Sequence, residues 1–447
     1  MAAELDALAV LVASAAAGTG EVETAVRAAM LGLGANVLEA LLGADRGHRG
    51  PQVTCQAGHR AAFVGYRPKT IDTVVGPVRI DRAYYHCPAC NSGVVPRDGD
   101  LGVSATSTSP GLSAMCTRAG AALPFAQAAA MIADLAGIPV ATKRVERVAE
   151  ASGQALETAI RERAEAIHTG ALSVLPTPDP PDMLYLAIDG TGVPMIPAAC
   201  QDRPGKGPDG RARTREVKLA AVFTQTRTDD AGHPVRDEDS TSYLATFADA
   251  SAFAPLVKAE AIRRGAEHVR QLVVLGDGAA WIWNLATKIL PAATQIVDIY
   301  HARQHVHDIA DAVAFMLIDR DQWLAERLAE LDAGNIADLI TAAEALPAVA
   351  SKAVERDKTL TYFRTNAHRM HYDRYRDLGM FIGSGAVEAG CKAVIGQRLK
   401  LSGMRWSHPG ATGILTLRAQ HASRDQDQIW HPRHNQTQPA DLPACAS

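Results

Sequence analysis

The sequence predicts an α/β protein of several domains, in which a mixed β-sheet forms the largest part. Three observations support this fold class. The chain has 447 residues, more than a single simple core needs. Short β-like runs and then helical periodicity occupy the first 170 residues, before a Pro-rich stretch at 171–182. Beyond that stretch, buried apolar runs alternate with helical patterns, and two of the runs end in an aspartate.

Composition indicates a globular protein without an export signal. The hydrophobic fraction is 47%, no apolar run approaches the roughly 20 residues of a membrane helix, and the first residues lack a basic region and a cleavage site. We therefore expect a cytoplasmic protein that does not enter a membrane. The net charge of −4 gives no general attraction for nucleic acid, so any DNA-binding surface must be a local patch.

The N-terminal part divides into a helical segment and a β-rich segment. Residues 1–48 are rich in Ala and Leu with helical spacing and are a candidate for self-association. Residues 49–104 contain two β-like runs, 70–75 and 78–85, and Gly76-Pro77 between them is typical of a turn. We expect a β-hairpin at this place.

Four candidate zinc ligands flank the hairpin. Cys55 and His59 precede it with three residues between them, and Cys87 and Cys90 follow it with two between them. Two pairs of thiolate and imidazole ligands joined by a hairpin suit one tetrahedral structural Zn²⁺, as in a zinc ribbon. The first pair is the weaker signal because it has a single cysteine: either His59 is a ligand, or the site has lost one. The alternative is that the cysteines are ordinary buried residues.

Residues 105–170 are predicted to be helical. An apolar-periodic run at 125–135, a break at 137–139 and a basic run at 142–147 suggest a helix-turn-helix that binds DNA. Paired helices of this size also occur in proteins that bind no DNA. The Pro-rich stretch at 171–182 is the best linker in the chain.

Residues 183–302 are predicted to form the first part of a catalytic core. The expected order is strand 184–188, turn 190–192, strand 193–196, strand 216–224, helix 254–266, strand 272–275, helix 279–290 and strand 295–299. Three successive strands followed by helix, strand, helix and strand is the order of an RNase H-like fold. We expect a helical insertion at 303–380, the last core helices at 381–423 and a disordered tail at 424–447.

Three acids are the candidate catalytic residues. Asp189 ends the first strand, Asp277 follows the strand 272–275, and Glu388 lies on a helix opened by Gly383-Ser384-Gly385. Carboxylates are the ligands that Mg²⁺ prefers, and two Mg²⁺ ions roughly 3.5–4 Å apart serve phosphodiester chemistry. Each acid alone has an ordinary explanation, as a turn or helix cap or as a solvent-facing helix residue. The set of three favours a metal site.

Four segments resemble the acid-bearing motifs of ISKra-family insertion-sequence transposases, which are similar to the wider Mutator-like group of DDE transposases. The segments are 188–194 (IDGTGVP), 275–279 (LGDGA), 298–301 (DIYH) and 383–388 (GSGAVE). The resemblance covers about residues 51–422. It implies that Asp189, Asp277 and Glu388 are the metal-binding triad. It differs at the first zinc pair, where the family usually has two cysteines.

The segment Asp298-x-x-His301 matches a further signature of that group, and its role has two interpretations. His301 could position the scissile phosphate or the nucleotide beside it. Alternatively, Asp298 could be a strand-end residue hydrogen-bonded to a histidine that starts a helix.

A basic strip follows Glu388, and it is the candidate DNA-binding surface of the core. Its members are Lys392, Arg398, Lys400, Arg405 and Trp406. Lysine and arginine beside a metal site could hold phosphates, and the tryptophan could stack on a base. Such residues are also common on a solvated helix face.

The sequence therefore predicts a DNA transposase that binds two catalytic Mg²⁺ and one structural Zn²⁺. Hydrolysis at the element end would leave a 3′-hydroxyl, and that hydroxyl would attack target DNA without a covalent enzyme intermediate. We expect a homo-oligomer on paired DNA ends, associated with the bacterial nucleoid when bound. Two alternatives are a nuclease of the same fold that does not join strands and a non-enzymatic zinc-dependent DNA-binding regulator. A glycosidase is remote because nothing indicates a sugar cleft.

Overall fold

The structure of the protein is a computed structural model, and it describes residues 18–174, 180–201, 203–205, 207, 210–348 and 350–423. The chain forms two compact units, residues 1–152 and 153–447. The division falls inside helix α6 (Thr142–His168), upstream of the expected linker at 171–182. Parts of that linker and the whole of the expected tail at 424–447 lie outside the described residues.

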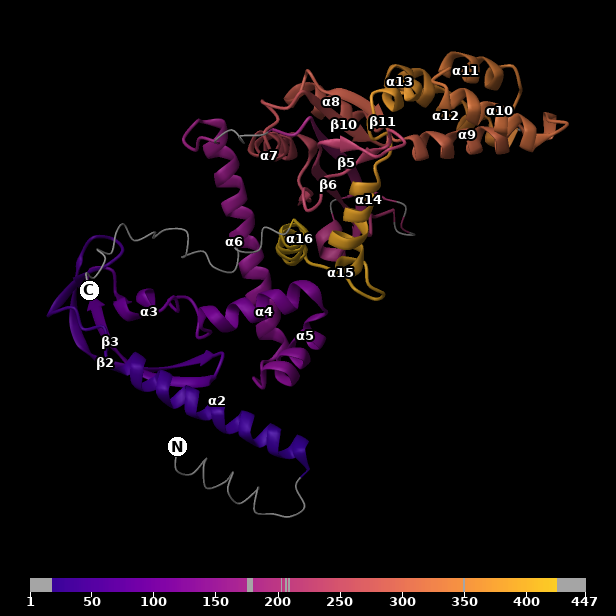
Figure 1. Ribbon diagram of the computed structural model, residues 1–447. Coiled ribbons are helices and arrows are strands. Elements are labelled where there is room, and N and C mark those ends of the chain that lie inside the picture. Colours follow the sequence, from indigo (N-terminus) through magenta and orange to yellow (C-terminus); the bar gives the residue numbers. More distant parts are fainter. Residues whose placement is uncertain are drawn as a thin grey trace, which may run out of the picture. The chain divides into compact units, whose positions relative to one another are not determined.

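A four-stranded antiparallel sheet is the centre of the first unit (Figure 1). Its strands are β1 (Gln52–Thr54), β2 (Arg60–Thr73), β3 (Gly76–Cys87) and β4 (Ser92–Val94). The long β2–β3 hairpin turns between Thr73 and Gly76, which confirms the hairpin expected around Gly76-Pro77. Gly76 has φ +113°, a value that favours glycine and explains its place in the turn.

Helix α2 (Thr19–Gly43) packs one apolar face on this hairpin. Ala35, Leu38 and Leu42 contact the buried Ile71, Val78 and Ile80. By length and composition alone, α2 is also long and apolar enough to cross a membrane, so the expectation that no segment comes near this limit was wrong. The helix is rich in Ala, Leu and Val, and a single such helix near an N-terminus is weak evidence for a membrane span.

The helices of the first unit contain the expected helix-turn-helix arrangement. They are α3 (Pro96–Asp100), α4 (Pro110–Ala122), α5 (Phe125–Met131), a π-helical turn η1 (Ile132–Ala136) and the start of α6. Gly137 ends the π-helical turn with φ +71°, and α6 begins five residues later. Leu112, Ala128 and Val145 meet in one buried cluster, which fixes the three helices around the turn.

A mixed five-stranded sheet is the core of the second unit. Its strands are β5 (Met183–Pro194), β6 (Thr214–Gln225), β9 (Ser242–Thr246), β10 (Gln271–Gly276) and β11 (Thr294–Val297), in the spatial order β11-β10-β5-β6-β9. β5, β6 and β9 pair antiparallel, whereas β10 is parallel to both β5 and β11. The expected α/β class with a mixed sheet is confirmed.

Two details of the expected strand order were wrong. The chain does not turn at Gly190–Gly192, because β5 continues through both glycines to Pro194. The glycines serve strand pairing instead: a Cβ on Gly190 would lie 2.8 Å from Oε1 of Glu216 on β6. The third antiparallel strand is β9, a segment for which no strand was expected. The number of strands was therefore right, although their division along the chain was not.

Helices cover both faces of the mixed sheet. α7 (Ala250–Arg263) and α8 (Ala280–Ile289) lie on one face, and α14 (Gly385–Gly390) and α16 (His408–Ala422) lie on the other (Figure 1). Between α14 and α16 come a π-helical segment η6 (Cys391–Gly396) and the short α15 (Gln397–Leu399). A Cβ on Gly390 would lie 2.5 Å from the ring of Tyr243, so this glycine allows α14 to pack closely on the sheet.

A helical segment follows the last strand, as expected for residues 303–380. It contains α9 (Ile299–Val313), α10 (Arg320–Asp332), α11 (Ile336–Glu344), α12 (Ala353–Asn366) and α13 (Tyr372–Asp377). These helices gather beyond β11 in Figure 1, and α9 connects them directly to the sheet. Shorter elements complete the unit: 3-10 turns at 197–200, 314–316, 350–352 and 367–369, and the hairpin of β7 (Arg227–Thr228) and β8 (Pro234–Val235).

Candidate metal centres

The strand register places three acids side by side at one edge of the mixed sheet. Ile188 of β5 pairs with Gly276 of β10, and Gly276 pairs with Val297 of β11. Each of these residues is followed directly by an aspartate, namely Asp189, Asp277 and Asp298. Because the three strands are parallel and in this register, the three aspartates lie next to one another across the sheet.

Asp298 is an internal anchor. Its side chain is fully buried, and its Oδ1 accepts the N–H of His301 at 2.9 Å, which caps α9. Its Oδ2 accepts the backbone N–H of Ser384, the residue before α14. Burial would raise the pKa of Asp298, but the hydrogen bonds from His301 and Ser384 outweigh it and lower the pKa. The structure thus supports the second interpretation of Asp298, as a strand-end residue that binds a helix-starting histidine.

This anchor brings Glu388 to the same edge of the sheet. Ligand atoms of Asp298, His301 and Glu388 all lie within 4.8 Å of one another. Ser384 also donates its hydroxyl to Oε1 of Glu388 at 3.4 Å. Glu388 is therefore on the side of the sheet where the strand-end acids lie, rather than on the far side.

His301 faces the acids from the first turn of α9. Its Nδ1 lies 3.4 Å from Oδ1 of Asp298, and its side chain is 43% exposed. The nearby carboxylate of Asp298 raises the pKa of His301, and the charges of Asp277 and Asp189 raise it further. The same three charges would favour a cation at this place.

Asp189 and Asp277 lie side by side, Asp277 directly after β10 and Asp189 within β5, which continues to Pro194 and so does not end at Asp189 as expected. Burial raises the pKa of Asp189, and the charge of Asp277 adds to this effect. Hydrogen bonds from the N–H of Gly190, at 2.6 Å, and from the thiol of Cys391, at 3.5 Å, act in the opposite direction. Two half-buried carboxylates side by side, of which one has its pKa raised by the charge of the other, are a donor set that a hard divalent cation would suit.

The loop that carries Asp277 is held from two sides. Oδ1 of Asp277 accepts the N–H of Ala279 at 2.8 Å, close to the capping expected for it, although α8 begins at Ala280. The hydroxyl of Tyr362 on α12 donates to the backbone carbonyl of Asp277 at 2.9 Å. Gly278 has φ +103°, and a Cβ there would lie 2.3 Å from the ring of Tyr362. Only a glycine leaves room for that ring.

Cys391 is a neighbour of the acids that sequence reasoning missed. Its Sγ contacts Oδ2 of Asp189, and burial together with the charges of Asp189 and Glu388 raises the pKa of the thiol to about 12. The positive charge of Lys400 acts in the opposite direction. A single cysteine in a helical stretch carries no signal of such a position, since free cysteines are usually plain core residues.

The basic strip divides into exposed and buried members. Lys392, Lys400 and Arg405 are exposed, and Nζ of Lys400 donates to Oγ1 of Thr191 at 2.5 Å, two residues beyond Asp189. Arg398 and Trp406 are buried, with 0% and 5% exposure, so the expectation that they contact DNA was wrong for this conformation.

Trp406 extends the mixed sheet. Its backbone exchanges hydrogen bonds with Pro194 and Ile196 beyond the end of β5, and its Nε1 donates to the carbonyl of Leu399 at 3.1 Å. The guanidinium of Arg398 lies 4.9 Å from the centre of the indole ring. The pair therefore closes the core beneath the strip, and a cation–π contact of this kind is strongest when it is shielded from water.

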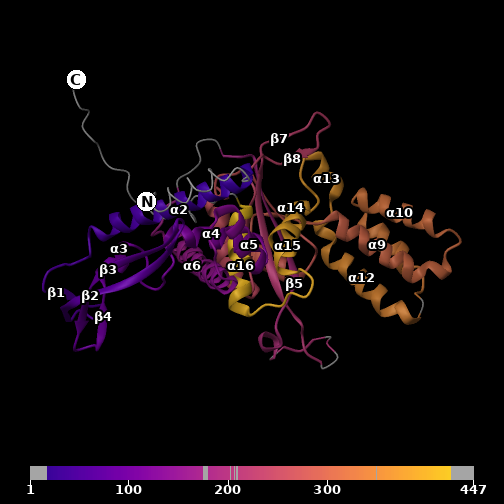
Figure 2. The ribbon, with the colours of Figure 1, turned by 90° about the horizontal axis from the view of Figure 1, so that it is seen from below.

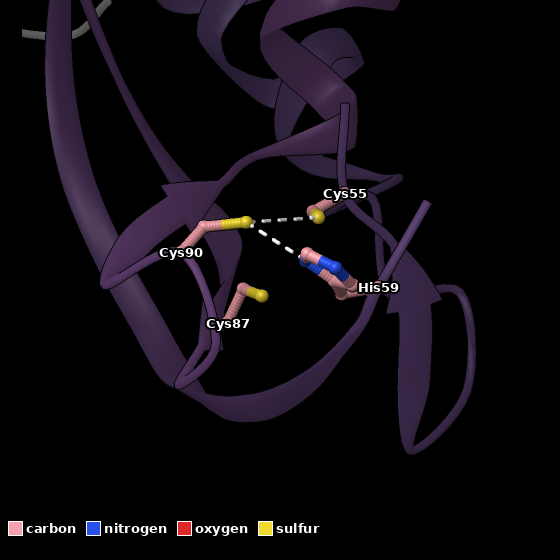
Figure 3. A group of neighbouring side chains, drawn as sticks. All are labelled: Cys55, His59, Cys87 and Cys90. Atoms are coloured by element: carbon pink, nitrogen blue, oxygen red, sulfur yellow. Dashed lines mark hydrogen bonds between the residues drawn. The ribbon is translucent and has the colours of Figure 1, made fainter. Parts of the chain in front are cut away.

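The four candidate zinc ligands converge in the first unit. Cys55 follows β1, His59 precedes β2, Cys87 ends β3 and Cys90 lies in the turn before β4; their ligand atoms all lie within 4.8 Å of one another (Figure 3). The sulfurs of Cys55 and Cys90 are 3.7 Å apart. In a tetrahedral site with Zn–S bonds of about 2.3 Å, two sulfurs are roughly 3.8 Å apart. His59 takes part, with Nδ1 at 3.0 Å from the sulfur of Cys90.

The pKa values of Cys55 and Cys90 in this cluster are shifted in opposite directions. Burial raises the pKa of Cys55, but backbone N–H groups of Ala57 and His59 and the neighbouring thiols outweigh it and lower the pKa. The hydrogen bond with Cys55, together with burial, raises the pKa of Cys90 to about 11. The lowered pKa of Cys55 beside the raised pKa of Cys90 suits a metal site, because zinc binds each cysteine as a thiolate and so removes the competition for protons.

Comparison with known proteins identifies no family. No family model matches the sequence, and no curated protein matches it. Among solved structures, the chain is similar to the Drosophila P element transposase strand transfer complex, with 12% identity and a TM-score of 0.19. The likeness covers 55% of this chain and 66% of that chain, slightly less than two thirds of its length. At this level of similarity, nothing about fold or function follows, and the resemblance to ISKra-family transposases stays a prediction.

Proposed function

We propose that the protein is a DNA transposase of the DDE class, with an RNase H-like catalytic unit and a zinc-ribbon-like, helical DNA-binding unit. The observation that carries the proposal is the register of β5, β10 and β11, which sets Asp189 and Asp277 beside Asp298. The strand order β9-β6-β5-β10-β11, with only β6 antiparallel to its two neighbours, is the order of RNase H-like sheets.

Asp189, Asp277 and Glu388 are the residues that would hold two Mg²⁺ ions, which would stabilise the attacking and leaving oxygens of a phosphodiester. Two of these acids are half-buried neighbours, the charge of Asp277 raising the pKa of Asp189, and the third accepts a hydrogen bond from Ser384. Asp298, whose ligand atom lies within 4.8 Å of those of His301 and Glu388, accepts a backbone N–H on each oxygen, and in this proposal it positions the site. The donor set therefore fits the metals that phosphoryl transfer requires.

The neighbouring side chains have roles that need only charge and position. His301, whose protonated form Asp298 favours, can donate a hydrogen bond to a phosphate oxygen beside the acids. Lys400 sits over the strand that carries Asp189, and Lys392 follows Glu388 by four residues. Both can bind the backbone of a DNA strand that crosses the site.

The Cys55, His59, Cys87 and Cys90 cluster would hold one structural Zn²⁺ and stabilise the β2–β3 hairpin for DNA binding. We further propose that the protein acts on chromosomal DNA in the cytoplasm, cleaves the two ends of its own element and joins the 3′-hydroxyls to target DNA. Because both DNA ends are cleaved and joined together, we propose that the protein acts as a homo-oligomer.

The test uses the DNA that flanks the gene for this chain as substrate. Asp277→Asn preserves the shape of the side chain but removes one negative charge, so Mg²⁺-dependent cleavage should fall at least about 100-fold while DNA affinity holds. Asp338→Asn, on the exposed face of α11, is the matched control and should cleave like the parent.

Three outcomes separate the alternatives. Cleavage together with joined products supports a transposase, whereas cleavage without joining reassigns the protein to the nucleases of the same fold. No Mg²⁺-dependent nicking by the parental protein, with DNA binding intact, leaves a zinc-dependent DNA-binding regulator. Parental rates in Asp277→Asn would overturn the two-metal mechanism.

A further inference from the structure

A cavity of about 640 Å³ lies against the loop and helix that carry the candidate catalytic residues. One wall is the first turn of α9, with Ile299 and Tyr300, directly beside His301. The lining also includes Gly383 and Gly385, on either side of the Ser384 that Asp298 holds, and Gly383 lies against the ring of Tyr300. The cavity and the acid cluster are therefore built on the same two segments.

The cavity has an apolar interior and an exposed aromatic side chain at its wall. Met380, Phe381 and Ile382 line it together with Ile299. Tyr300 is 63% exposed, and a Cβ on Gly383 would lie 2.9 Å from its ring, so the glycine lets the ring lie against the backbone. An exposed aromatic ring above an apolar pocket is how proteins bind nucleobases by stacking.

The charges around the cavity balance. Arg303 and Arg376 both line it, and both bind the carboxylate of Asp332, with Arg303 Nη2 at 2.6 Å from Oδ2 and Arg376 Nη2 at 3.3 Å from Oδ1. Asp377 lines it as well. Two guanidinium groups offset by two carboxylates favour a neutral planar group over a phosphate.

The remaining side of the cavity is the tip of the β7–β8 hairpin. Residues 231–234 of this tip line the cavity, as do Arg376 and Asp377 at the end of α13, and Figure 2 shows the hairpin next to that helix. The volume lies within the range of about 300–1,000 Å³ that is usual for small-molecule and cofactor sites, so a whole nucleoside fits.

We infer that this cavity receives one nucleobase of the DNA strand bound at the acid cluster, turned out of the duplex and stacked on Tyr300. The inference rests on the proposed function, because the acid cluster must hold a DNA phosphate beside His301. Extrusion of a base costs stacking and pairing energy, which contact with the Tyr300 ring and the apolar lining would offset. Binding of this base would fix which phosphodiester of the strand lies at the acid cluster.

The experiment measures DNA affinity in Ca²⁺, in which cleavage is suppressed, for the full-length protein. The probes are the duplexes that the parental protein cuts in Mg²⁺, each with a single abasic site at one of four positions on either side of the cut. Tyr300→Leu removes the ring, and Tyr300→Phe is the matched control that keeps it. At one position, the abasic site should weaken parental binding by about five- to 150-fold, the range for loss of one stacked base.

The test is whether the preference for an intact base over an abasic site depends on the aromatic ring at position 300. Tyr300→Phe should keep the preference for the intact base, and Tyr300→Leu should bind intact and abasic duplexes equally at that position. If Tyr300→Leu retains the parental preference, or no position shows a preference, the inference is overturned even though cleavage by the parent stands. If the parent does not cut in Mg²⁺, the proposed function fails first, so the two failures are distinguishable.

Discussion

Asp298 accepts the backbone N–H of Ser384, 86 residues further along the chain, and so joins the end of β11 to the start of α14. Through this one carboxylate the helix with Glu388 is attached to the helix with His301. The relative positions of His301 and Glu388 thus depend on the hydrogen bonds of Asp298.

Asp298→Asn should destabilise the protein by about 1.5 to 3 kcal/mol, because an amide cannot accept both N–H groups with a charged oxygen. The pKa of Asp298 is lowered by folding, so its contribution is fully present above the ordinary value of 3.8 and is lost as the pH falls through the lower folded pKa. Urea unfolding should therefore show a constant difference from the parent at pH 5 to 7 that shrinks on acidification below about pH 4. The exposed Asp338→Asn should show no such difference, and an equal loss in both variants would refute the anchor.

Cys391 should react slowly with iodoacetamide at pH 8, because its pKa of about 12 leaves little thiolate. Asp189→Asn removes a charge that raises this pKa, so alkylation should become faster. Lys400→Met removes a charge that lowers it, so alkylation should become slower. The adduct at Cys391 is quantified by mass spectrometry, with the buried Cys200 as the internal control. Equal rates in all three proteins would show that Asp189 and Lys400 do not act on the thiol.

Lys392→Ala should affect DNA binding, whereas Arg398→Ala should affect the stability of the fold. Lys392 is exposed, so its loss should weaken DNA binding, reduce the slope of log affinity against log salt by about 0.9 and leave the unfolding midpoint unchanged. Arg398 is fully buried on Trp406, so its loss should cost about 2 kcal/mol of stability. Arg398→Met keeps most of the volume and should cost less. Binding titrations at two salt concentrations and thermal unfolding distinguish the two classes; a salt effect in Arg398→Ala without destabilisation would return Arg398 to the DNA surface.

The purified protein should contain about one Zn²⁺ per chain. Cys87→Ser removes one of the four ligands and should release the metal and loosen the β2–β3 hairpin, whereas Cys200→Ser, in the other unit, should retain it. His59→Ala decides whether the histidine is a ligand, since a weaker zinc affinity is expected only if Nδ1 binds the metal. Elemental analysis and competition with a chelator provide the readout. Parental zinc content in Cys87→Ser would exclude the site.

The mixed sheet could be predicted from sequence because its central strands are strongly apolar. β5, β6, β10 and β11 contain buried runs rich in Val, Ile, Leu and Ala, and the aspartates that follow the apolar runs of β5, β10 and β11 carry a recognisable chemistry. β9 (Ser242–Thr246) escaped prediction because it is short, polar at both ends and only partly buried between them. Gly190 and Gly192 looked like a turn because glycine has no local signal that separates a turn from close pairing with a neighbouring strand.

For the candidate site, too, residues with a local sequence signal could be predicted, and contacts that depend on the folded chain could not. Asp189, Asp277 and Glu388 could be selected because their residue type and their place at element ends suit metal chemistry. The burial of Arg398 and Trp406 depends on how the segment folds back beyond β5, which their local sequence does not encode. The proximity of Cys391 to Asp189 joins residues 202 positions apart, so only the folded chain reveals it.

Tyr362 gives the helical segment after β11 a mechanical connection to the site. Its hydroxyl binds the backbone of Asp277, and its ring occupies the space above Gly278. α12 therefore cannot slide along α9 without either breaking that hydrogen bond or displacing the aspartate. A truncated protein that joined β11 directly to α14 would keep every acid and still lose the support that holds one of them in place. Movement of the helical segment would therefore be transmitted to Asp277 through Tyr362.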